Sequence, residues 1–502
     1  MSARRWRLLI VALTMVVASL PGLAAGSSHG HMTTDPALVT LNVGGDVTPI
    51  ISVGEMVDDV LFDGLPDGIG LVPNNADSNM VDVYVTHEQS TVPFRNARDF
   101  VDASVTRWTL DTTTGHALGA ELAISSDEGF LRFCSASVAS PDDGFDTHVL
   151  FANEETNDVV ARPPGASYQP DPAIAPLRQG GYTVALDTAT GDFEPIAGMG
   201  RHNHENTVAV PGYDDLVLLS GDDTFSATTA QLYMYLADDQ DDLFKDKGTL
   251  WAFRVTHKNG SPVDTGDAFN NANDYLDLGV DDEMRGEFIK VPKQIARGQT
   301  IEAPQDALEN WSIENNVFTF IRLEDIAVDK YDNRVVYVAD TGASRVVRNP
   351  DTGRLHRPSG TGLADNGRIF KFVFNDDDPR QVDSFTVFGD GDAATSHPKF
   401  VGFTSPDNID TSANSLMVQE DADFAQIWQH EFSSGTWTAV ADVVDTGGES
   451  SGIVDASAWF GPGSWLLVVQ AHDLPVVDSA MDGDVLVKRE EGQLLLMNIP
   501  GS

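Results

Sequence analysis

A weak repeat of short apolar runs, each bounded by polar residues, limits the folds that this 502-residue chain can adopt. In each copy an acidic or polar residue opens a short strand-like run, a turn follows, and a second apolar run ends on another acid or amide. The copies span residues 67–88, 134–154, 205–222, 324–340, 407–420 and 449–470. Few segments keep a helical period for three turns, so the chain is predicted to be all-β.

Six copies of a strand–turn–strand unit predict a six-bladed β-propeller over residues 41–502. The innermost strands of a propeller line a central channel, so polar residues at matching ends of the copies should converge on the axis. For a single copy, polar strand ends need no such explanation because they enter solvated loops. Recurrence in six copies favours a converging site. A polar stretch at about 264–316, with a helix near 303–310, is expected to be an insertion that covers the site or decorates the surface.

The charge of the chain is strongly acidic. Its 77 Asp and Glu residues outnumber 31 Lys and Arg residues, which gives a net charge of −46. Such a field repels nucleic acid and anionic lipid and attracts cations. Adaptation to high salt would also produce this composition, so the charge excludes nucleic acid as an expected partner without identifying a metal site.

The first 25 residues have the three parts of a secretory signal: a basic start, an apolar run over residues 8–20, and small residues up to Ala25. We therefore expect residues 1–25 to be removed, residues 26–40 to form a linker, and the mature protein to be secreted or periplasmic. Adjacent Arg4 and Arg5 suggest twin-arginine export, and the same segment is equally compatible with Sec export. No later apolar run is long enough to span a bilayer, and we expect a monomer that does not bind membranes.

Cys134 is the only cysteine, so no disulfide can form within the chain. Stability must come from packing, with bound ions as a further candidate source. The sequence leaves two roles open for Cys134, a small buried packing residue or a metal ligand.

Short acidic motifs at the ends of the repeats supply the oxygen atoms that a hard cation requires. Ca²⁺ takes about six to eight oxygens from carboxylates, amides and backbone carbonyls. The candidate ligands are Glu88, Glu154, Glu205, Asp222, Glu324, Asp407 and Glu449. Carboxylates that converge raise one another's pKa, and a bound cation would relieve that repulsion. His87 and His204 each precede a glutamate, and imidazole would suit Fe or Zn better than Ca²⁺.

Arg201 and Arg322 stand within the same acidic motifs, where a planar guanidinium could hold a substrate oxyanion such as phosphate. An ion pair with a neighbouring acid is the alternative for both arginines. His204 is a candidate catalytic acid, a metal ligand or a packing residue. The sequence contains no serine-hydrolase elbow, no phosphate-binding Gly-Lys motif and no dinucleotide fingerprint, so nucleophilic serine chemistry is disfavoured.

The order of these motifs resembles that of the PhoX-type secreted alkaline phosphatases over nearly the whole mature chain. The matching segments are DGIG at 67–70, VTHE at 85–88, FANEE at 151–155, HE at 204–205, SGDD at 220–223, GTLWAFR at 248–254, RLED at 322–325, SPDN at 405–408 and VQAH at 469–472. The resemblance implies a six-bladed propeller that holds Fe³⁺ and Ca²⁺ and hydrolyses phosphate monoesters outside the cytoplasm. It also implies phosphate binding by Arg322 and metal ligation by Glu205, Glu324, Asp407 and Glu449, with Glu88 and Glu154 as further ligands.

One departure from the family pattern concerns iron. In the family a cysteine directly before the paired glutamates ligates iron, whereas this chain has Asn153 at that position. An amide lacks the charge and softness of a thiolate. Cys134 opens the same repeat and is the candidate replacement, and Asn153 is counted among the expected substrate-binding residues.

We therefore predict an enzyme: a secreted, metal-dependent phosphoester hydrolase that acts on small phosphorylated substrates and uses Ca²⁺ and, in addition, Fe³⁺. Two alternatives stay open. One is a non-catalytic Ca²⁺-binding propeller that binds a partner or a surface ligand. The other is a Ca²⁺-dependent, lactonase-like hydrolase, since one fold supports many chemistries.

Overall fold

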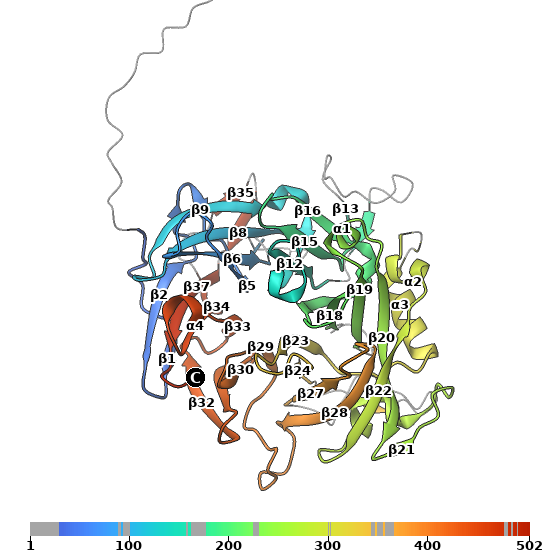
Figure 1. Cartoon of the computed structure of the whole chain (residues 1–502). Coiled ribbons are helices and arrows are strands. Elements are labelled where there is room, and N and C mark those ends of the chain that lie inside the picture. The colour runs from blue at the N-terminus through green and yellow to red at the C-terminus, as the bar shows by residue number, and fades with distance from the viewer. Residues whose placement is uncertain are drawn as a thin grey trace, which may run out of the picture.

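The computed structural model is all-β, with its sheets arranged around a central axis like the blades of a propeller (Figure 1). It describes residues 30–88, 92–93, 101–156, 159–161, 177–223, 230–299, 301, 303–342, 347–348, 355–356, 366–475, 480–482, 485–488 and 490–502. The expected signal peptide lies outside the described residues, as do residues 26–29 of the expected linker. In the described chain, no helix is both long enough and apolar enough to cross a membrane.

Six inner strands line the axis in the described part of the chain. They are β5 (Pro66–Pro73), β11 (Phe133–Ala139), β17 (His204–Ala209), β23 (Leu323–Val328), β29 (Pro406–Thr411) and β33 (Glu449–Asp455). Each packs against the next, and β33 packs against β5, which closes the ring.

Each inner strand pairs antiparallel with the second strand of the same sequence repeat. These partners are β6 (Met80–His87), β12 (Val149–Glu154), β18 (Leu216–Asp222), β24 (Val335–Asp340), β30 (Ser415–Glu420) and β34 (Ser464–Pro475). Each copy of the repeat is therefore one antiparallel pair at the axis.

Four blades are separate sheets among the described residues. They contain β5-β6-β8-β9, β11-β12-β15-β16, β29-β30-β31-β32 and β33-β34-β37-β2. Their outer strands are β8 (Val101–Asp111), β9 (Ala117–Ile124), β15 (Thr183–Asp187), β16 (Phe193–Ile196), β31 (Gln426–Glu431), β32 (Thr436–Val443), β37 (Glu490–Asn498) and β2 (Asp46–Ser52).

The two remaining inner strands, β17 and β23, belong to one ten-stranded sheet, which corrects the prediction of six separate blades. This sheet runs from β17 and β18 through β19 (Leu232–Ala237) and β20 (Thr249–Lys258) to β22 (Glu283–Lys290). It continues through β28 (Gln381–Asp390) and β27 (Arg368–Phe374) to β24 and β23, and the short β21 (Ser261–Pro262) pairs with β20. Because β22 pairs with both β20 and β28, it joins two antiparallel meanders into a single sheet.

The joining strand lies within the polar stretch at 264–316 that was expected to be an insertion. In β22 the buried residues Met284, Gly286 and Phe288 alternate with more exposed polar ones, as in a strand with one face on the core. That stretch also contains α2 (Lys293–Arg297) and α3 (Pro304–Glu314), and α3 lies where a helix was expected.

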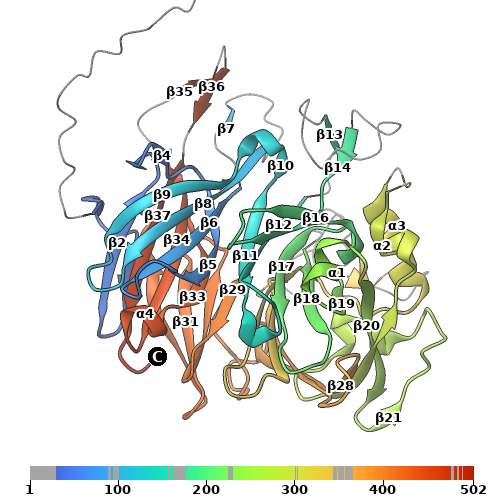
Figure 2. The ribbon, with the colours of Figure 1, turned by 45° about the horizontal axis from the view of Figure 1, so that its top comes forward.

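The N-terminal strands join the two ends of the chain. Strand β2 pairs with β37, so that Asp46 lies opposite Asn498, and β1 (Val39–Leu41) pairs with β32 in the neighbouring blade. Both views show β2 beside β37 (Figures 1 and 2). Ile50, Ile51 and Leu494 are fully buried in this blade, so the ring is held by hydrophobic packing as well as by hydrogen bonds.

Candidate metal centre

A β-bulge near the start of each inner strand sets the direction of the site residues. The register shifts lie between Pro66 and Ile69, Phe133 and Ser135, His204 and Thr207, Leu323 and Ile326, Pro406 and Ile409, and Ser451 and Ile453. A bulge adds one unpaired residue to a strand and re-aims its side chains. In five strands the second residue lies within the bulge and faces an axial cavity. In β33 it is the first residue that faces the cavity, and this residue precedes the bulge and pairs with Gln470. These residues are Asp67, Cys134, Glu205, Glu324, Asp407 and Glu449.

A further set of acids comes from the residue that directly follows the second strand of a pair. Glu88, Glu155 and Asp421 occupy this position and line the same cavity. Their backbone N–H groups donate to the carbonyls of Leu65, Arg132 and Ser405, respectively, at 3.0–3.1 Å, and each acceptor directly precedes an inner strand. One recurring backbone hydrogen bond therefore holds the two sets of acids next to each other.

The axial cavity has a volume of about 410 Å³. Besides these carboxylates and the Cys134 thiol, it is lined by Arg132, Arg322, Gln470 and His472. Its acidic side chains form four donor groups, and the ligand atoms within each group lie within 4.8 Å of one another. The groups are Asp67–Glu88–Cys134, Cys134–Glu155–Glu205, Glu205–Glu324–Asp407 and Asp407–Asp421–Glu449. Consecutive groups share a residue, so the donors form a continuous chain around the cavity.

Burial and mutual repulsion strongly perturb these carboxyl groups. Burial raises the pKa of Glu205 well above its ordinary value, and Glu324, Glu155 and Asp407 raise it further. The pKa values of Asp67, Glu155, Glu324, Asp407 and Glu449 are raised well above normal as well, in each case chiefly by burial. Burial also raises the pKa of the Cys134 thiol, followed by the effect of Glu155.

The donor atoms fit metal ions. Glu205 Oε2 and Asp67 Oδ1 are buried and accept no hydrogen bond within the described chain. Such orphaned acceptors are rare in proteins, and a cation is one group that would satisfy them. The two all-oxygen groups, which share Asp407, suit Ca²⁺. The two groups that share Cys134 add a thiol, which suits a transition metal such as iron.

Two arginines reach the cavity from equivalent positions, each directly before an inner strand. Arg322 forms a bidentate ion pair with Asp223, with Nε 2.8 Å from Oδ1 and Nη2 2.6 Å from Oδ2. Its Nη2 also lies 3.2 Å from Glu324. Arg132, which the sequence analysis missed, lies 3.9 Å from Glu88 and 3.7 Å from Glu155. The described wall of the cavity therefore carries two guanidinium groups among eight carboxylates.

The structure brings together the predicted residues Glu88, Glu205, Arg322, Glu324, Asp407 and Glu449, but it places the other five elsewhere. Glu154 lies outside the cavity, where it accepts the backbone N–H groups of Leu131 at 2.9 Å and Tyr182 at 3.2 Å. Asp222 lies 3.9 Å from His202. Both acids end a strand, and in each case the following acid turns inward: Glu155 lines the cavity and Asp223 holds Arg322.

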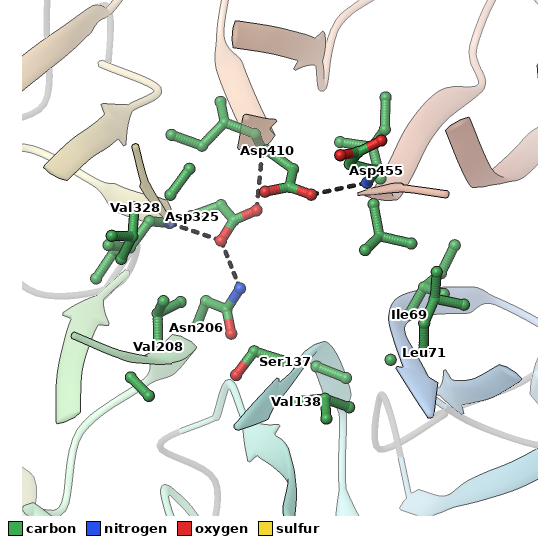
Figure 3. A pocket seen from close by; sticks show the side chains of 18 of the residues that line it. Ile69, Leu71, Ser137, Val138, Asn206, Val208, Asp325, Val328, Asp410 and Asp455 are labelled. Carbon is green, nitrogen blue, oxygen red and sulfur yellow. Dashed lines mark hydrogen bonds between the residues drawn. The ribbon is translucent and has the colours of Figure 1, made fainter. Parts of the chain in front are cut away.

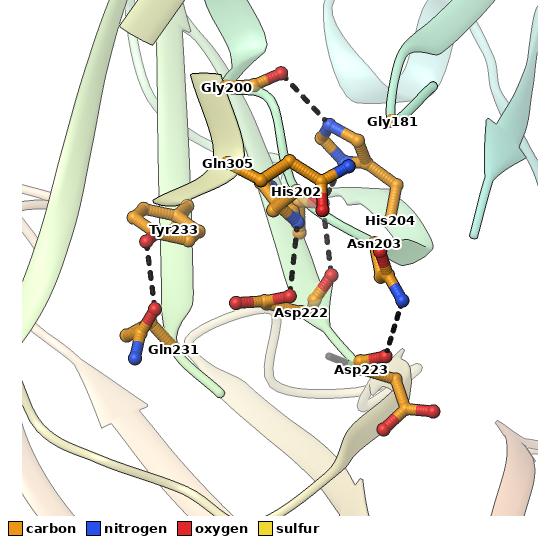
Figure 4. Close-up of polar contacts among 12 residues, drawn as sticks. Gly181, Gly200, His202, Asn203, His204, Asp222, Asp223, Gln231, Tyr233 and Gln305 are labelled. Atoms are coloured by element: carbon orange, nitrogen blue, oxygen red, sulfur yellow. Dashed lines mark hydrogen bonds and ion pairs between the residues drawn. The ribbon is translucent and has the colours of Figure 1, made fainter. Parts of the chain in front are cut away.

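His204 does not line the cavity; its ring lies beside His202 and contacts the carbonyl of Gly200 (Figure 4). Its Nδ1 is 2.7 Å from Ser220 Oγ and its Nε2 is 3.2 Å from the carbonyl of Gly200. The ring lies against that of His202, with centroids 3.6 Å apart. Burial lowers the pKa of His204 to about 3, so it is neutral at physiological pH. These contacts make it a packing residue.

Arg201 and Asn153 are fixed within the protein interior. Arg201 lies 3.7 Å over the ring of Tyr182 and donates to the carbonyls of Gly180 at 2.9 Å and Gly181 at 3.2 Å. Asn153 donates to Ser135 and accepts hydrogen bonds from Thr183 and Thr207, all at 2.8–3.0 Å.

Several lining residues were not predicted as site residues, although the repeat included or bordered them. Asp67 opens one copy of the repeat, and Glu155 and Asp421 each directly follow the end of one. Cys134 opens another copy and had been left open between a packing residue and a metal ligand. The signal that could have identified Glu155 and Asp421 is that each is the second of two adjacent acids, at 154–155 and 420–421. The first acid of such a pair is still part of the strand. Like Glu154, Glu420 accepts hydrogen bonds from two backbone N–H groups, those of Thr404 and Gln426.

Comparisons with known proteins relate the chain to one family and to a solved structure of similar fold. The family model described as Alkaline phosphatase PhoX matches residues 157–457, which is more than half of the chain. Among solved structures, the chain is similar to Pseudomonas fluorescens PhoX in complex with vanadate, a transition state analogue. The TM-score is 0.62 at 15% sequence identity, and the match covers 94% of this chain and 98% of that chain. No curated protein matches the chain.

Proposed function

The chain belongs to the PhoX alkaline phosphatase family, and on that premise we propose that it is a metal-dependent hydrolase of phosphate monoesters. Family membership supports phosphatase-type hydrolysis. The observation that carries the proposal is the continuous chain of four donor groups around one cavity, with arginines on its wall. The cavity volume of about 410 Å³ suits a small phosphorylated substrate.

The donor groups divide between two kinds of cation. Glu205, Glu324, Asp407, Asp421 and Glu449 offer only oxygen and would hold Ca²⁺. The groups that contain Cys134 would hold Fe³⁺, because a thiolate is the softer ligand. When bound, these ions would neutralise the phosphoryl oxygens and activate the attacking oxygen.

We infer that Cys134 supplies the sulfur ligand for iron that position 153 lacks. Asn153 is committed to Ser135, Thr183 and Thr207, whereas the thiol of Cys134 lies in the cavity between Asp67 and Glu155. The absence of a cysteine at position 153 is therefore no argument against iron in this chain.

Arg322 is the residue suited to orient the phosphoryl group. Asp223 is fully buried and binds one edge of the guanidinium through both carboxylate oxygens, which fixes the plane of the group at the cavity wall. A guanidinium held in this way loses little conformational entropy when it binds an oxyanion. It would stabilise charge that develops on the phosphoryl oxygens during hydrolysis.

We also propose that the protein acts outside the cytoplasm as a monomer after residues 1–25 are removed. The support is the basic, apolar and small-residue pattern of these residues in the sequence. N-terminal sequencing and size measurement of the exported protein test this part of the proposal. A mature protein that keeps its first 25 residues would contradict it.

A phosphate-release assay tests the activity. Protein stripped with a chelator and reloaded with Ca²⁺ and Fe³⁺ should release phosphate from a generic aryl phosphate at neutral or alkaline pH. Arg322→Ala should lower kcat/KM by about 10–100-fold, since hydrogen bonds to charged groups contribute about 1.5–3 kcal/mol. Ca²⁺ binding without phosphate release would favour a non-catalytic Ca²⁺-binding propeller, and hydrolysis of an aryl lactone alone would favour a lactonase. Either result would contradict the phosphatase proposal.

A further inference from the structure

A second layer of residues lies directly beneath the acidic cavity. It consists of the residue that follows the cavity residue in five inner strands, and of a glycine in the sixth. The layer contains Gly68, Ser135, Asn206, Asp325, Asn408 and Gly452. It borders another cavity on the axis, of about 610 Å³, which Figure 3 shows from close by.

One half of this layer is held by direct backbone packing. A Cβ atom on Gly68 would lie 1.8 Å from the backbone nitrogen of Ala136, and one on Gly452 would lie 2.2 Å from the carbonyl oxygen of Asp67. Strands β33, β5 and β11 therefore approach one another so closely that only glycine fits at these two contacts.

The other half is held by side chains, and Asp325 connects them. Its Oδ1 accepts hydrogen bonds from the side-chain amide of Asn206 on β17 and, at 2.6 Å, from the backbone N–H of Ile326 on its own strand. Its Oδ2 accepts the backbone N–H of Ile409 on β29 at 2.9 Å. One carboxylate, only 5% exposed, therefore joins three consecutive inner strands at their bulges (Figure 3).

The residues joined in this way lie next to one donor group of the acidic cavity. Asn206 follows Glu205, Asp325 follows Glu324, and Ile409 is two residues after Asp407. Glu205, Glu324 and Asp407 are the donors whose ligand atoms lie within 4.8 Å of one another. A bulge interrupts the hydrogen bonds between paired strands, so strand pairing alone does not fix the spacing of these three donors.

We propose that Asp325 is a positioning residue that fixes the spacing of Glu205, Glu324 and Asp407 and thereby sets the affinity of this group for its cation. This inference rests on the metal centre of the proposed function. All three partners of Asp325 are N–H donors, so a carboxylate can satisfy them and an amide cannot: Asn at this position would turn an NH₂ group toward a donor.

The expected effect follows from the behaviour of residues that orient metal ligands. Replacement of such partners typically lowers metal affinity by about 10–100-fold. Each of the other three donor groups contains at most one of Glu205, Glu324 and Asp407. Their affinity for a cation should therefore change less. Selective weakening of one class of sites is what separates positioning from a general structural role.

The test compares Asp325→Asn with Asp410→Asn in the full mature chain. Asp410 lines the same 610 Å³ cavity and also accepts hydrogen bonds from backbone N–H groups, those of Thr411 at 2.7 Å and Asp455 at 2.8 Å. Unlike Asp325, it binds no residue adjacent to Glu205 or Glu324 in the described chain. After chelator treatment each protein is titrated with Ca²⁺ alone by calorimetry. We expect Asp325→Asn to weaken one class of Ca²⁺ sites by about 10–100-fold. A high Ca²⁺ concentration should restore the full stoichiometry, and Asp410→Asn should match the unsubstituted protein.

Asn206→Ala provides a second variant if Asp325→Asn does not fold, because it removes one of the three contacts and leaves the carboxylate in place. It should weaken the same class of sites, by a smaller factor. Unchanged Ca²⁺ affinity in a folded Asp325→Asn or Asn206→Ala protein would overturn the inference, as would equal weakening in Asp410→Asn. Failure of the unsubstituted protein to bind Ca²⁺ would instead contradict the metal centre of the proposed function. Ca²⁺ binding without phosphate release would contradict only the proposed activity.

Discussion

Replacing Glu205 by Gln should change the stability of the protein in opposite directions with and without metal. Glu205 belongs to two donor groups, with Cys134 and Glu155 on one side and with Glu324 and Asp407 on the other. Its side chain is buried, and its Oε2 accepts no hydrogen bond within the described chain. In the metal-free protein this carboxylate faces like charges, whereas in the loaded protein it would be a cation ligand.

The geometry sets the size of the effect. Two unit charges separated by the 4.8 Å limit of a donor group repel by about 3.5 kcal/mol at an effective dielectric constant of about 20. Protonation relieves part of this repulsion, because the pKa of Glu205 and of its neighbours is raised. We therefore expect Glu205→Gln to raise the free energy of unfolding of the metal-free protein by about 1–3 kcal/mol. In excess Ca²⁺ the sign should reverse, since each tenfold loss of affinity removes about 1.4 kcal/mol of stabilisation.

Urea unfolding, followed by tryptophan fluorescence in EDTA and in excess Ca²⁺, measures both signs. Glu154→Gln is the matched control, because Glu154 is an equally buried glutamate that accepts two backbone N–H groups outside the cavity. This control should be destabilised by about 1–3 kcal/mol in both conditions. If Glu205→Gln behaves like Glu154→Gln, with equal destabilisation in EDTA and in Ca²⁺, the reasoning about repulsion and metal ligation is refuted.

Three further predictions concern pH, iron and substrate binding. Because the folded metal-free protein has carboxyls with raised pKa values, it binds more protons than the unfolded chain above about pH 4.5, so its free energy of unfolding should fall as the pH rises toward 8. The increase in the urea midpoint on adding Ca²⁺ should therefore be larger at pH 8 than at pH 5. An increase that does not depend on pH would contradict the raised pKa values of these carboxyl groups. Cys134→Ser should lose iron, measured by elemental mass spectrometry, while keeping Ca²⁺, and Asn153→Ala should keep both; iron loss in the Asn153 variant alone would reverse the assignment. Arg132→Ala should raise KM for an aryl phosphate by about tenfold with less effect on kcat, because a charge-assisted contact contributes about 1.5–3 kcal/mol; an unchanged KM would exclude substrate contact by Arg132.

The sequence repeat located the strands at the axis but not all of their connections. Each of the six copies corresponds to an inner strand and its antiparallel partner. The sheets around them could not be assigned from the same signal, because β22 has charged residues at alternate positions and reads as a polar insertion. Pairing with β20 and β28 turns that segment into the strand that joins two meanders.

Within the candidate site, the sequence identified the acidic strand ends, and the bulges decided which acid faces the axis. Side chains alternate along a strand, so a shift of one residue exchanges the buried face for the exposed one. Glu155 directly follows Glu154, so the two side chains point to opposite sides, and Glu155 lines the cavity while Glu154 binds backbone. Cys134 lies within the bulge of β11 and meets the acids, whereas Asn153 on the regular partner strand does not.

The sequence by itself therefore determined an all-β repeat with acids gathered at its strand ends, because apolar periodicity, turn residues and charge are local properties of the chain. Only the tertiary structure decided which of those acids converge on one cavity, and that Cys134, Arg132 and Asp325 stand among or beneath them. The reason is that a convergent site is built from bulges and from contacts between strands far apart in the chain, and neither leaves a periodic signal in the sequence.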